Sequence, residues 1–282
     1  MIAEIGQITY SPYRSNTVRA IPALKDNYIW CIGTDSVVVV VDPGQAQPVF
    51  DELSRRGASL AAILVTHHHH DHVDGIPALK ARWPQARVIG PARCQPLGVD
   101  ETVRHGDAVD IPEIDLHAWV LATPGHTQDH LSYFCAHLPD HPHPALFCGD
   151  TLFSAGCGRV FDGTVEQLFD SLGRLGSLPE ETQAYAAHEY TITNLQFAIQ
   201  AEPENPHLQQ RLRDARLLRD AGLPTLPVPL HLEHATNPFL RSHLPALAQH
   251  LPEGDLSPSS STFNTFAALR RWRNSFQPPA DN

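Results

Sequence analysis

The chain has 282 residues, 42% of them hydrophobic and 18% charged, so it can bury the core of one large domain or two unequal ones. Aspartate and glutamate number 31 against 20 lysine and arginine, and the net charge of −11 argues against a nucleic-acid partner. The longest apolar run, Val37 to Val41, is too short to span a membrane, and the N-terminal residues lack the apolar stretch of a secretory signal. The five cysteines are odd in number and have no paired spacing, so we expect a cytoplasmic protein.

Up to about residue 187, short apolar runs alternate with turn signals, and they predict strands and helices in mixed order. The predicted strands are Thr17–Leu24, Tyr28–Gly33, Val37–Val41, Ala61–Thr66, Arg87–Ile89, His117–Ala122, Leu131–Ala136, Ala145–Cys148 and Ala184–Ala187. The predicted helices between them are Pro48–Arg56, Ile76–Trp83 and Val165–Leu175. This order is typical of sheets covered by helices, which is an α/β fold.

Beyond His188 the pattern becomes helical. Helices are predicted at 193–201, 207–221 and 262–276, with a proline-rich connector at 223–232 and a Ser/Pro-rich segment at 256–261. We therefore expect a catalytic domain over residues 1–187, of which about the first 17 form an extension. A smaller helical domain that binds substrate is expected over residues 188–282.

The strongest chemical signal is the run THHHHDH at positions 66–72, directly after the apolar residues 61–65. Open α/β sheets place their sites at the C-terminal ends of strands. Alternate side chains of an extended backbone share a face, so His67 and His69 can converge on one point, while Asp71 and its neighbour serve a second. Imidazole and carboxylate groups together suit zinc, iron or manganese. A histidine-rich loop without metal is the alternative, but such a loop has no reason to follow a buried strand.

Three more residues of ligand type stand at predicted strand ends, namely His126, Asp150 and His188. Taken singly, each has a plain alternative as a surface histidine in a turn or as an aspartate that caps the next segment. Four strand ends that all carry ligand-type residues favour one shared metal site. None of the five cysteines has the spacing of a nucleophile with a histidine partner.

The T-H-x-H-x-D-H motif with a distant His, Asp and His resembles that of the metallo-β-lactamase superfamily. Within it, the segments Gly156–Arg159, His188–Tyr190 and Asn237–Arg241 resemble the hydroxyacylglutathione hydrolase (glyoxalase II) family, and the likeness runs from about Val18 to Phe276. The resemblance implies an αββα sandwich followed by a smaller C-terminal helical domain.

The resemblance also implies two divalent metal ions per protomer, zinc in the first place with iron or manganese as alternatives. The implied ligands are His67, His69 and His126 for one ion, Asp71, His72 and His188 for the other, and Asp150 as the bridge between them. A hydroxide that bridges the ions, oriented by Asp71 as the catalytic residue, would attack the thioester carbonyl of S-lactoylglutathione or another S-(2-hydroxyacyl)glutathione. The products would be glutathione and a 2-hydroxy acid such as lactate, as in the second step of the glyoxalase pathway for methylglyoxal detoxification. We expect a monomer.

The residues implied to contact the glutathione thioester are Arg159, Tyr190, Arg270 and Arg273. For the two C-terminal arginines, a solvated helix end is the alternative. The sequence also departs from the family pattern, since Phe161 stands where a tyrosine is common and Asp129 where a glycine is common. Arginine stands at 159 and 273, where lysine is frequent.

Two other functions stay open on the residues alone. A related enzyme such as a persulfide dioxygenase would need one iron held by two histidines and a carboxylate. A protein that binds metal or glutathione without catalysis would need no complete ligand set. The seven ligand-type residues favour the hydrolase.

Overall fold

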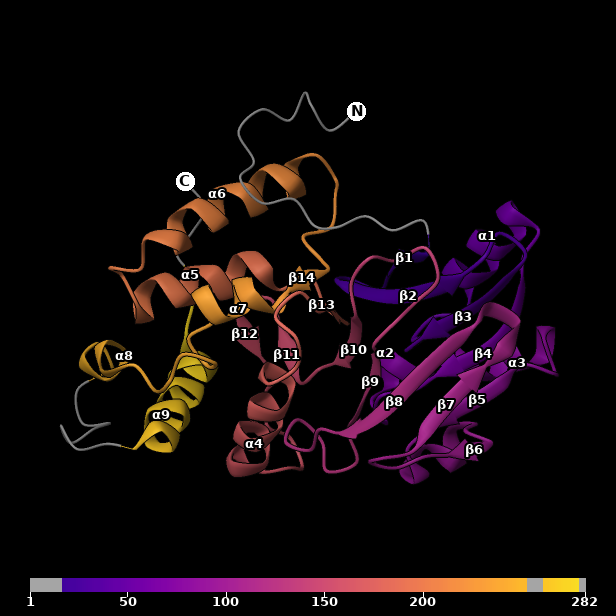
Figure 1. Cartoon of the computed structure of the whole chain (residues 1–282), viewed down its shortest axis with the longest axis horizontal. Helices are drawn as coiled ribbons and strands as arrows, with labels where there is room; N and C mark the ends of the chain where they lie inside the picture. Colours follow the sequence, from indigo (N-terminus) through magenta and orange to yellow (C-terminus); the bar gives the residue numbers. More distant parts are fainter. Residues whose placement is uncertain (1–16, 253–260, 279–282) are drawn as a thin grey trace.

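The structure, a computed structural model, describes residues 17–252 and 261–278, and its two mixed β-sheets occupy the right-hand part of Figure 1, with the C-terminal helices on the left. The first sheet has the order β1-β2-β3-β4-β5-β6, antiparallel up to β3 and parallel beyond it. Its strands are β1 (Val18–Ala23), β2 (Asn27–Gly33), β3 (Val37–Val41), β4 (Ser59–Leu64), β5 (Arg87–Gly90) and β6 (Glu101–Thr102).

The second sheet has the order β14-β13-β10-β9-β8-β7, in which only β10 and β13 run parallel. Its strands are β7 (Ala108–Ile111), β8 (Leu116–Ala122), β9 (Leu131–Cys135), β10 (Ala145–Gly149), β13 (Gln183–Ala186) and β14 (Val228–Pro229). A separate two-stranded sheet is formed by β11 (Leu152–Phe153) and β12 (Gly156–Cys157).

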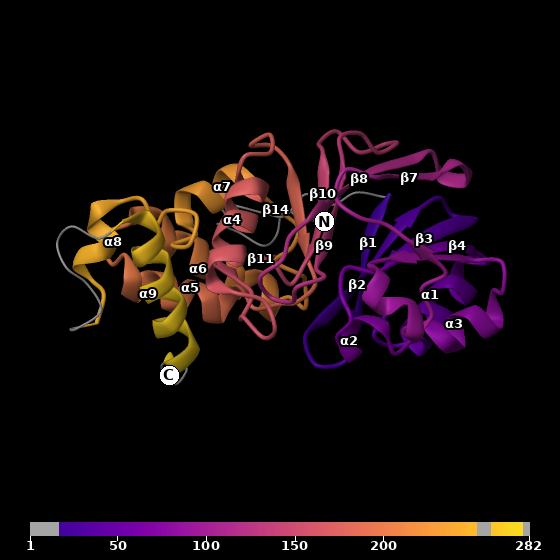
Figure 2. The ribbon, with the colours of Figure 1, turned by 90° about the horizontal axis from the view of Figure 1, so that it is seen from below.

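The first four helices lie outside the two sheets, and the other helices belong to the C-terminal part of the chain. Those of the first part are α1 (Gln47–Arg56), α2 (His70–Val73), α3 (Ile76–Arg82) and α4 (Val165–Gly176). The rest are α5 (Thr191–Ala201), α6 (Pro206–Asp220), α7 (Leu230–Thr236), α8 (Pro245–Gln249) and α9 (Thr262–Ser275). Seen from below, β7 and β8 lie above the first sheet, α1 and α3 lie beneath it, and α5 to α9 gather beyond one end of the sandwich (Figure 2).

The hydrophobic side chains of β2 and β3 divide between two cores. Tyr28, Trp30 and Ile32 belong to the core between the sheets, whereas Ile29 and Cys31 pack with Val49 and Leu53 of α1. This division follows from the alternation of side chains along a strand, and a strand that is buried on both faces needs a continuous apolar run. The predicted αββα sandwich is confirmed by these layers, as are the strands expected in them, to within two residues at their ends.

The predicted connector over 223–232 is wrong at its C-terminal end. Val228 and Pro229 pair with Ala184 and Gln183 as strand β14, and Leu230 begins helix α7. A proline is tolerated there because β14 is an edge strand and its missing N–H costs no ladder bond. The second sheet thus includes a strand from the C-terminal part of the chain, and the division at 187/188 stays a prediction. The expected extension, apart from residue 17, and the Ser/Pro-rich segment, apart from Ser261, lie outside the described residues.

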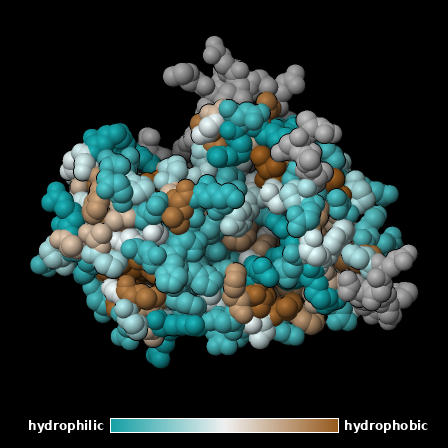
Figure 3. Space-filling view, turned by 180° about the vertical axis from the view of Figure 1, so that it is seen from behind, coloured by the Kyte–Doolittle hydropathy of each residue, from teal (hydrophilic) through white to brown (hydrophobic). Residues whose placement is uncertain are grey.

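The face opposite to that of Figure 1 is largely hydrophilic, with its hydrophobic side chains in small separate groups (Figure 3). Within the described residues, no helix has both the length and the apolar character that a membrane crossing requires.

Candidate metal centre

The histidine run begins just after the C-terminal end of β4. Asp42, which directly follows β3, holds the first residue of the run in place. The Asp42 carboxylate accepts hydrogen bonds from the backbone N–H of Thr66 at 2.8 Å and from its hydroxyl at 2.7 Å. The chain then turns into α2, which lies against the segment after β3. A Cβ atom on Gly44 would lie 2.0 Å from the carbonyl oxygen of Asp71, so only glycine permits this approach.

His67, His69 and His126 form the first of two clusters. Nδ1 of His69 lies 3.1 Å from Nε2 of His67 and 3.0 Å from Nε2 of His126. His67 and His126 are buried, whereas His69 is half-buried. Three ring nitrogens thus converge from two separate loops, as the sequence predicts for one metal position.

Asp71, His72 and His188 form the second cluster. Oδ2 of Asp71 lies 3.5 Å from Nε2 of His72 and 3.4 Å from Nε2 of His188. His188 reaches this point from the end of β13, and its ring stacks on that of Tyr190, with ring centroids 4.8 Å apart.

Asp150 lies between the two clusters and presents one oxygen to each. Its Oδ2 is 3.4 Å from Nε2 of His126, and its Oδ1 is 3.4 Å from Nε2 of His188 and 3.5 Å from that of His72. Its backbone N–H donates to Nε2 of His130 at 3.1 Å, which holds the loop after β10 in place. A carboxylate in this position can be shared between two cations.

The chemistry of these side chains fits metal ions. Nε2 of His72 and Oδ1 of Asp150 are buried without a hydrogen-bond partner, although unpaired buried polar atoms are costly. Nitrogen and oxygen donors in groups of three are the usual ligands of zinc, iron and manganese. The buried His/Asp clusters therefore form a site suited to metal.

The two clusters differ in the pKa values of their histidines. Burial and neighbouring imidazoles lower the pKa of His67 well below its ordinary value and that of His69 to about 4. Burial also lowers the pKa of His126. In the second cluster burial acts in the same direction, but the charges of Asp150 and of further carboxylates outweigh it and raise the pKa of His72 and of His188.

The carboxyl groups stay ionised for a related reason. Burial raises the pKa of Asp150, but the charges of His188 and His72 outweigh it and bring the pKa well below the usual range. For Asp71, burial is likewise outweighed, by a hydrogen bond to His188 and the charge of His72.

Sequence reasoning missed the residues that orient the ligand rings. Nδ1 of His72 lies 3.0 Å from Oδ2 of Asp42, and Nδ1 of His188 lies 2.9 Å from Oδ1 of Asp26. In the first cluster, Nδ1 of His67 lies 3.0 Å from the hydroxyl of Thr66, and Nδ1 of His126 donates to the carbonyl of Arg159 at 2.7 Å. Such partners fix the orientation of a ligand ring and raise its basicity. In the sequence, the only indication that Asp26 and Asp42 have this role is their position in turns that join or follow strands.

The two other histidines of the run point away from the clusters. His70 is exposed, and its Nδ1 lies 3.0 Å from Oδ1 of Asp74. Nδ1 of His68 lies 2.9 Å from Oδ1 of Asp129. The aspartate that departs from the family pattern therefore pairs with His68 and has no recorded contact with His126.

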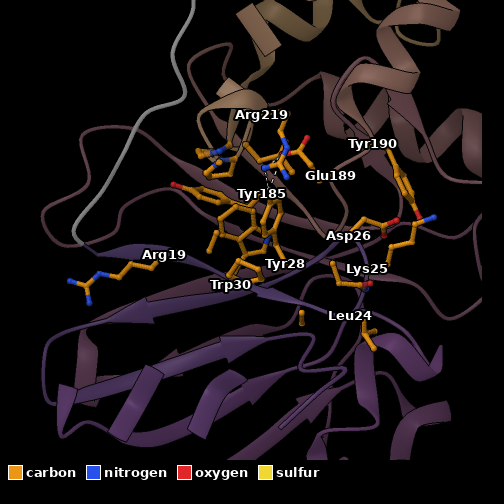
Figure 4. A pocket seen from close by; sticks show the side chains of 18 of the residues that line it. Arg19, Leu24, Lys25, Asp26, Tyr28, Trp30, Tyr185, Glu189, Tyr190 and Arg219 are labelled. Carbon is orange, nitrogen blue, oxygen red and sulfur yellow. Dashed lines mark hydrogen bonds and ion pairs between the residues drawn. The ribbon is translucent and has the colours of Figure 1, made fainter. Parts of the chain in front are cut away.

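The residues predicted to contact substrate lie in different surroundings. Tyr190 and Arg273 line a groove of about 1180 Å³ that also contains Asp26, Asn27 and Leu24 (Figure 4). Arg159 is exposed, and its guanidinium carbon lies 5.8 Å from the ring centre of Phe161. The Phe161 ring, 62% exposed, lies 5.1 Å from the ring of His69 and 5.2 Å from that of His126.

Arg270 is buried under the loop that carries Arg159. Its Nη1 donates to the carbonyls of Cys157 at 2.8 Å and Gly158 at 3.0 Å, and its Nη2 donates to Asn274 at 3.1 Å. Arg273, one helical turn later, donates through Nη2 to Oδ1 of Asn194 at 3.2 Å and faces the groove. The two arginines are therefore not equivalent, and a direct substrate contact by Arg270 stays a prediction.

Two family models match consecutive parts of the chain. Residues 25–188 match the metallo-beta-lactamase superfamily, and residues 189–276 match the hydroxyacylglutathione hydrolase C-terminus. The hydroxyacylglutathione hydrolase of Photobacterium profundum is 46% identical over 261 residues, which cover 92% of this chain and 99% of that protein.

This chain belongs to the hydroxyacylglutathione hydrolase family.

A second relative with the same name, from Chromohalobacter salexigens, is 48% identical over 263 residues, again 92% of this chain and 99% of that protein. A solved metallo-beta-lactamase structure from Staphylococcus aureus shares the fold, with a TM-score of 0.55 and 19% identity over 90% of this chain and 72% of that chain. The superfamily and the hydroxyacylglutathione hydrolase family predicted from the motifs are both confirmed.

Proposed function

We propose that this member of the hydroxyacylglutathione hydrolase family hydrolyses the thioester of S-(2-hydroxyacyl)glutathione, with S-lactoylglutathione as substrate and glutathione and lactate as products. The observation that carries the proposal is Asp150, whose two oxygens face two adjoining clusters of ligand-type side chains. Family membership supplies the substrate class.

The proposed ligands of one ion are His67, His69 and His126, those of the other are Asp71, His72 and His188, and Asp150 joins both. We place zinc first and keep iron and manganese as alternatives, because nitrogen and oxygen ligands accept all three. When bound, such a pair of ions would activate a water molecule and polarise the thioester carbonyl.

Asp71 has the proposed role of orienting the attacking water. Its side chain is 37% exposed, so it reaches the open side of the site, and Nδ2 of Asn27 donates to its Oδ2 at 3.0 Å. The other ligand-type side chains of this cluster are buried. The leaving thiolate is stable in water, so the reaction needs no strong general acid among the protein groups.

The chain offers no cysteine nucleophile. All five cysteines are buried and free of disulfides, and burial raises the pKa of the Cys31 thiol to about 11 and that of Cys94 and Cys135 to about 12. Thiols of this kind stay protonated at neutral pH and are inert. Five free thiols also support the cytoplasm as the proposed compartment. We propose a monomer.

We propose that glutathione lies along the groove, with a carboxylate toward Arg273 and its backbone against Tyr190, and that Arg159, which lies outside the groove beside Phe161, also contacts it. Arg270 would act on the same contact through the loop at 157–159, which it holds by two carbonyl bonds. Phe161 has no hydroxyl, so it can offer only its ring face to the substrate.

The test is a metal analysis of protein purified without chelator, together with assays on S-lactoylglutathione and on a small thioester that lacks the glutathione carboxylates. Two metal ions per protomer and a strong preference for the glutathione thioester are expected. One iron per protomer with oxygen consumption on a persulfide would favour the dioxygenase, and bound metal without turnover would favour a binding protein.

A further inference from the structure

Glu189 follows the proposed ligand His188, and its carboxylate joins three distant segments of the chain. Oε2 accepts hydrogen bonds from the hydroxyl of Tyr28 on β2 and from the backbone N–H of Thr225, both at 2.9 Å. Oε1 accepts from the hydroxyl of Thr225 at 2.6 Å. Arg219, at the C-terminal end of α6, lies 3.7 Å from Oε2 and donates to the hydroxyl of Tyr28 at 3.1 Å. The side chain of Glu189 is only 8% exposed, so these bonds fix its position.

The start of β2 and the residue before it also hold His188. The backbone N–H of Glu189 donates to the carbonyl of Asp26 at 2.9 Å, and that of Tyr28 donates to the carbonyl of Ala187 at 2.7 Å. Oδ1 of Asp26 is the partner of Nδ1 of His188. His188 is therefore held on both sides by backbone bonds to one short segment, and a displaced Glu189 must displace its neighbour.

Among the described residues, no hydrogen bond or ion pair joins the first cluster to α6 in this way. The recorded partners of its outer ring nitrogens are the hydroxyl of Thr66 and the carbonyl of Arg159, neither of which belongs to α6 or to the segment after it. Tyr28, Glu189 and Arg219 instead line the groove, where they group beside Tyr185 above β2 (Figure 4). They stand between helix α6 and the second cluster only.

We propose that Arg219 and Tyr28 are positioning residues that act through Glu189 on His188, so that helix α6 sets the zinc affinity of the second cluster and not that of the first. The inference rests on the proposed function, which assigns metal to this cluster. Loss of a residue that orients a metal ligand costs about 10- to 100-fold in affinity. Arg219 and Tyr28 contact Glu189 and not His188 itself, so we expect a loss of zinc affinity at the lower end of this range, about tenfold.

The experiment measures zinc retention by the zinc-loaded protein during dialysis against increasing concentrations of a chelator. Arg219→Met removes the charge, Tyr28→Phe removes one hydroxyl with little risk to folding, and Arg219→Lys restores the charge. The control is Arg241→Met, which breaks a partly buried ion pair of the helical part, with Glu202 at 2.6 Å, away from His188. His188→Ala shows which of two release steps belongs to the second cluster.

The wild type and Arg241→Met should release two zinc ions in the same two steps. In Arg219→Met and Tyr28→Phe, the step assigned by His188→Ala should move to an about tenfold lower chelator concentration, while the other step stays. Arg219→Lys should recover part of the shift.

The inference is overturned if Arg219→Met and Tyr28→Phe match the wild type, if Arg219→Met and Arg241→Met shift alike, or if both steps move together. Those outcomes, in a wild type that holds two zinc ions and hydrolyses the thioester, leave the proposed function intact. A wild type with fewer than two zinc ions would overturn the proposed site and this inference with it.

Discussion

The cluster of His67, His69 and His126 has neutral partners behind its rings, whereas the cluster of Asp71, His72 and His188 is backed by Asp42 and Asp26. Ligands of nearly the same kind therefore have opposite pKa shifts, lowered in the first cluster and raised in the second. The carboxylates that make an imidazole a stronger ligand also make it a stronger base. A cation that binds the second cluster must therefore displace protons from its histidines, whereas a cation that binds the first cluster need not.

Removal of the shared carboxylate tests whether the two clusters form one site. Asp150→Ala should lose at least about 100-fold in hydrolysis of S-lactoylglutathione and also the second metal ion, since both clusters lose their common anion. Metal content and activity are measured on the same preparation. His70→Ala, which changes an exposed histidine of the same run, is the control. Full metal content and activity in Asp150→Ala would mean that no shared site exists.

The carboxylate behind His72 tests the difference between the clusters. Asp42→Asn should weaken the zinc ion of the second cluster by about 10- to 100-fold and that of the first by less, because Asp42 faces His72 directly but reaches His67 only through Thr66. Chelator competition followed by zinc analysis gives both affinities. Asp129→Asn changes an aspartate that pairs with His68 outside the clusters and should leave both affinities alone. Equal loss at both positions would contradict the comparison.

The opposite pKa shifts predict different pH dependences of zinc uptake by the metal-free protein. The surrounding carboxylates raise the pKa of His188, so zinc binding at the second cluster must displace a proton at pH values where the low-pKa histidines of the first cluster are already neutral. The affinity of that cluster should rise about tenfold per pH unit across neutral pH. The first cluster should show little dependence above about pH 5, because the pKa of His69 is about 4. Calorimetry in buffers of different ionisation enthalpy counts the protons, and equal release from both clusters would count against this prediction.

A change outside both clusters gives the smallest effect. Arg273→Ala should raise KM for S-lactoylglutathione by up to about tenfold, since it removes one partly exposed charged hydrogen bond, and leave kcat unchanged. Hydrolysis of a small thioester without carboxylates should not change.

Arg270→Ala is the companion variant. It should lower the free energy of unfolding by about 1–3 kcal/mol, because the carbonyls of Cys157 and Gly158 lose their donor. Steady-state kinetics and thermal unfolding separate the two arginines. If Arg273→Ala lost activity equally on S-lactoylglutathione and on the small thioester, Arg273 would have a structural role like that of Arg270.

The sandwich and the clustered ligand residues could be predicted because both follow from local patterns. Continuous apolar runs mark strands buried on both faces, and ligand-type residues directly after such runs must lie at the sheet edge. The partners of His72 and His188 could not be assigned, because which turn lies beside which histidine depends on the order of strands in the sheet.

The two arginines of α9 are a second case in which the sequence does not show which segment packs beside a residue. Their spacing of three residues puts Arg270 and Arg273 on one face, but the sequence does not say that the loop after β12 covers only the first. Strand β14 was missed because two residues that include a proline carry no strand pattern, and pairing with β13 alone defines it.

The pairing of β14 with β13 also has a consequence for any attempt to make the N-terminal part of the chain by itself. A fragment that ends near residue 188 would leave the outer side of β13 without its partner and would free the carbonyls of Thr182 and Glu180, which accept bonds from Leu230 and His231. An open strand edge of this kind recruits other chains, so the fragment should aggregate. The C-terminal part thus protects an open strand edge of the part that carries the ligand-type residues.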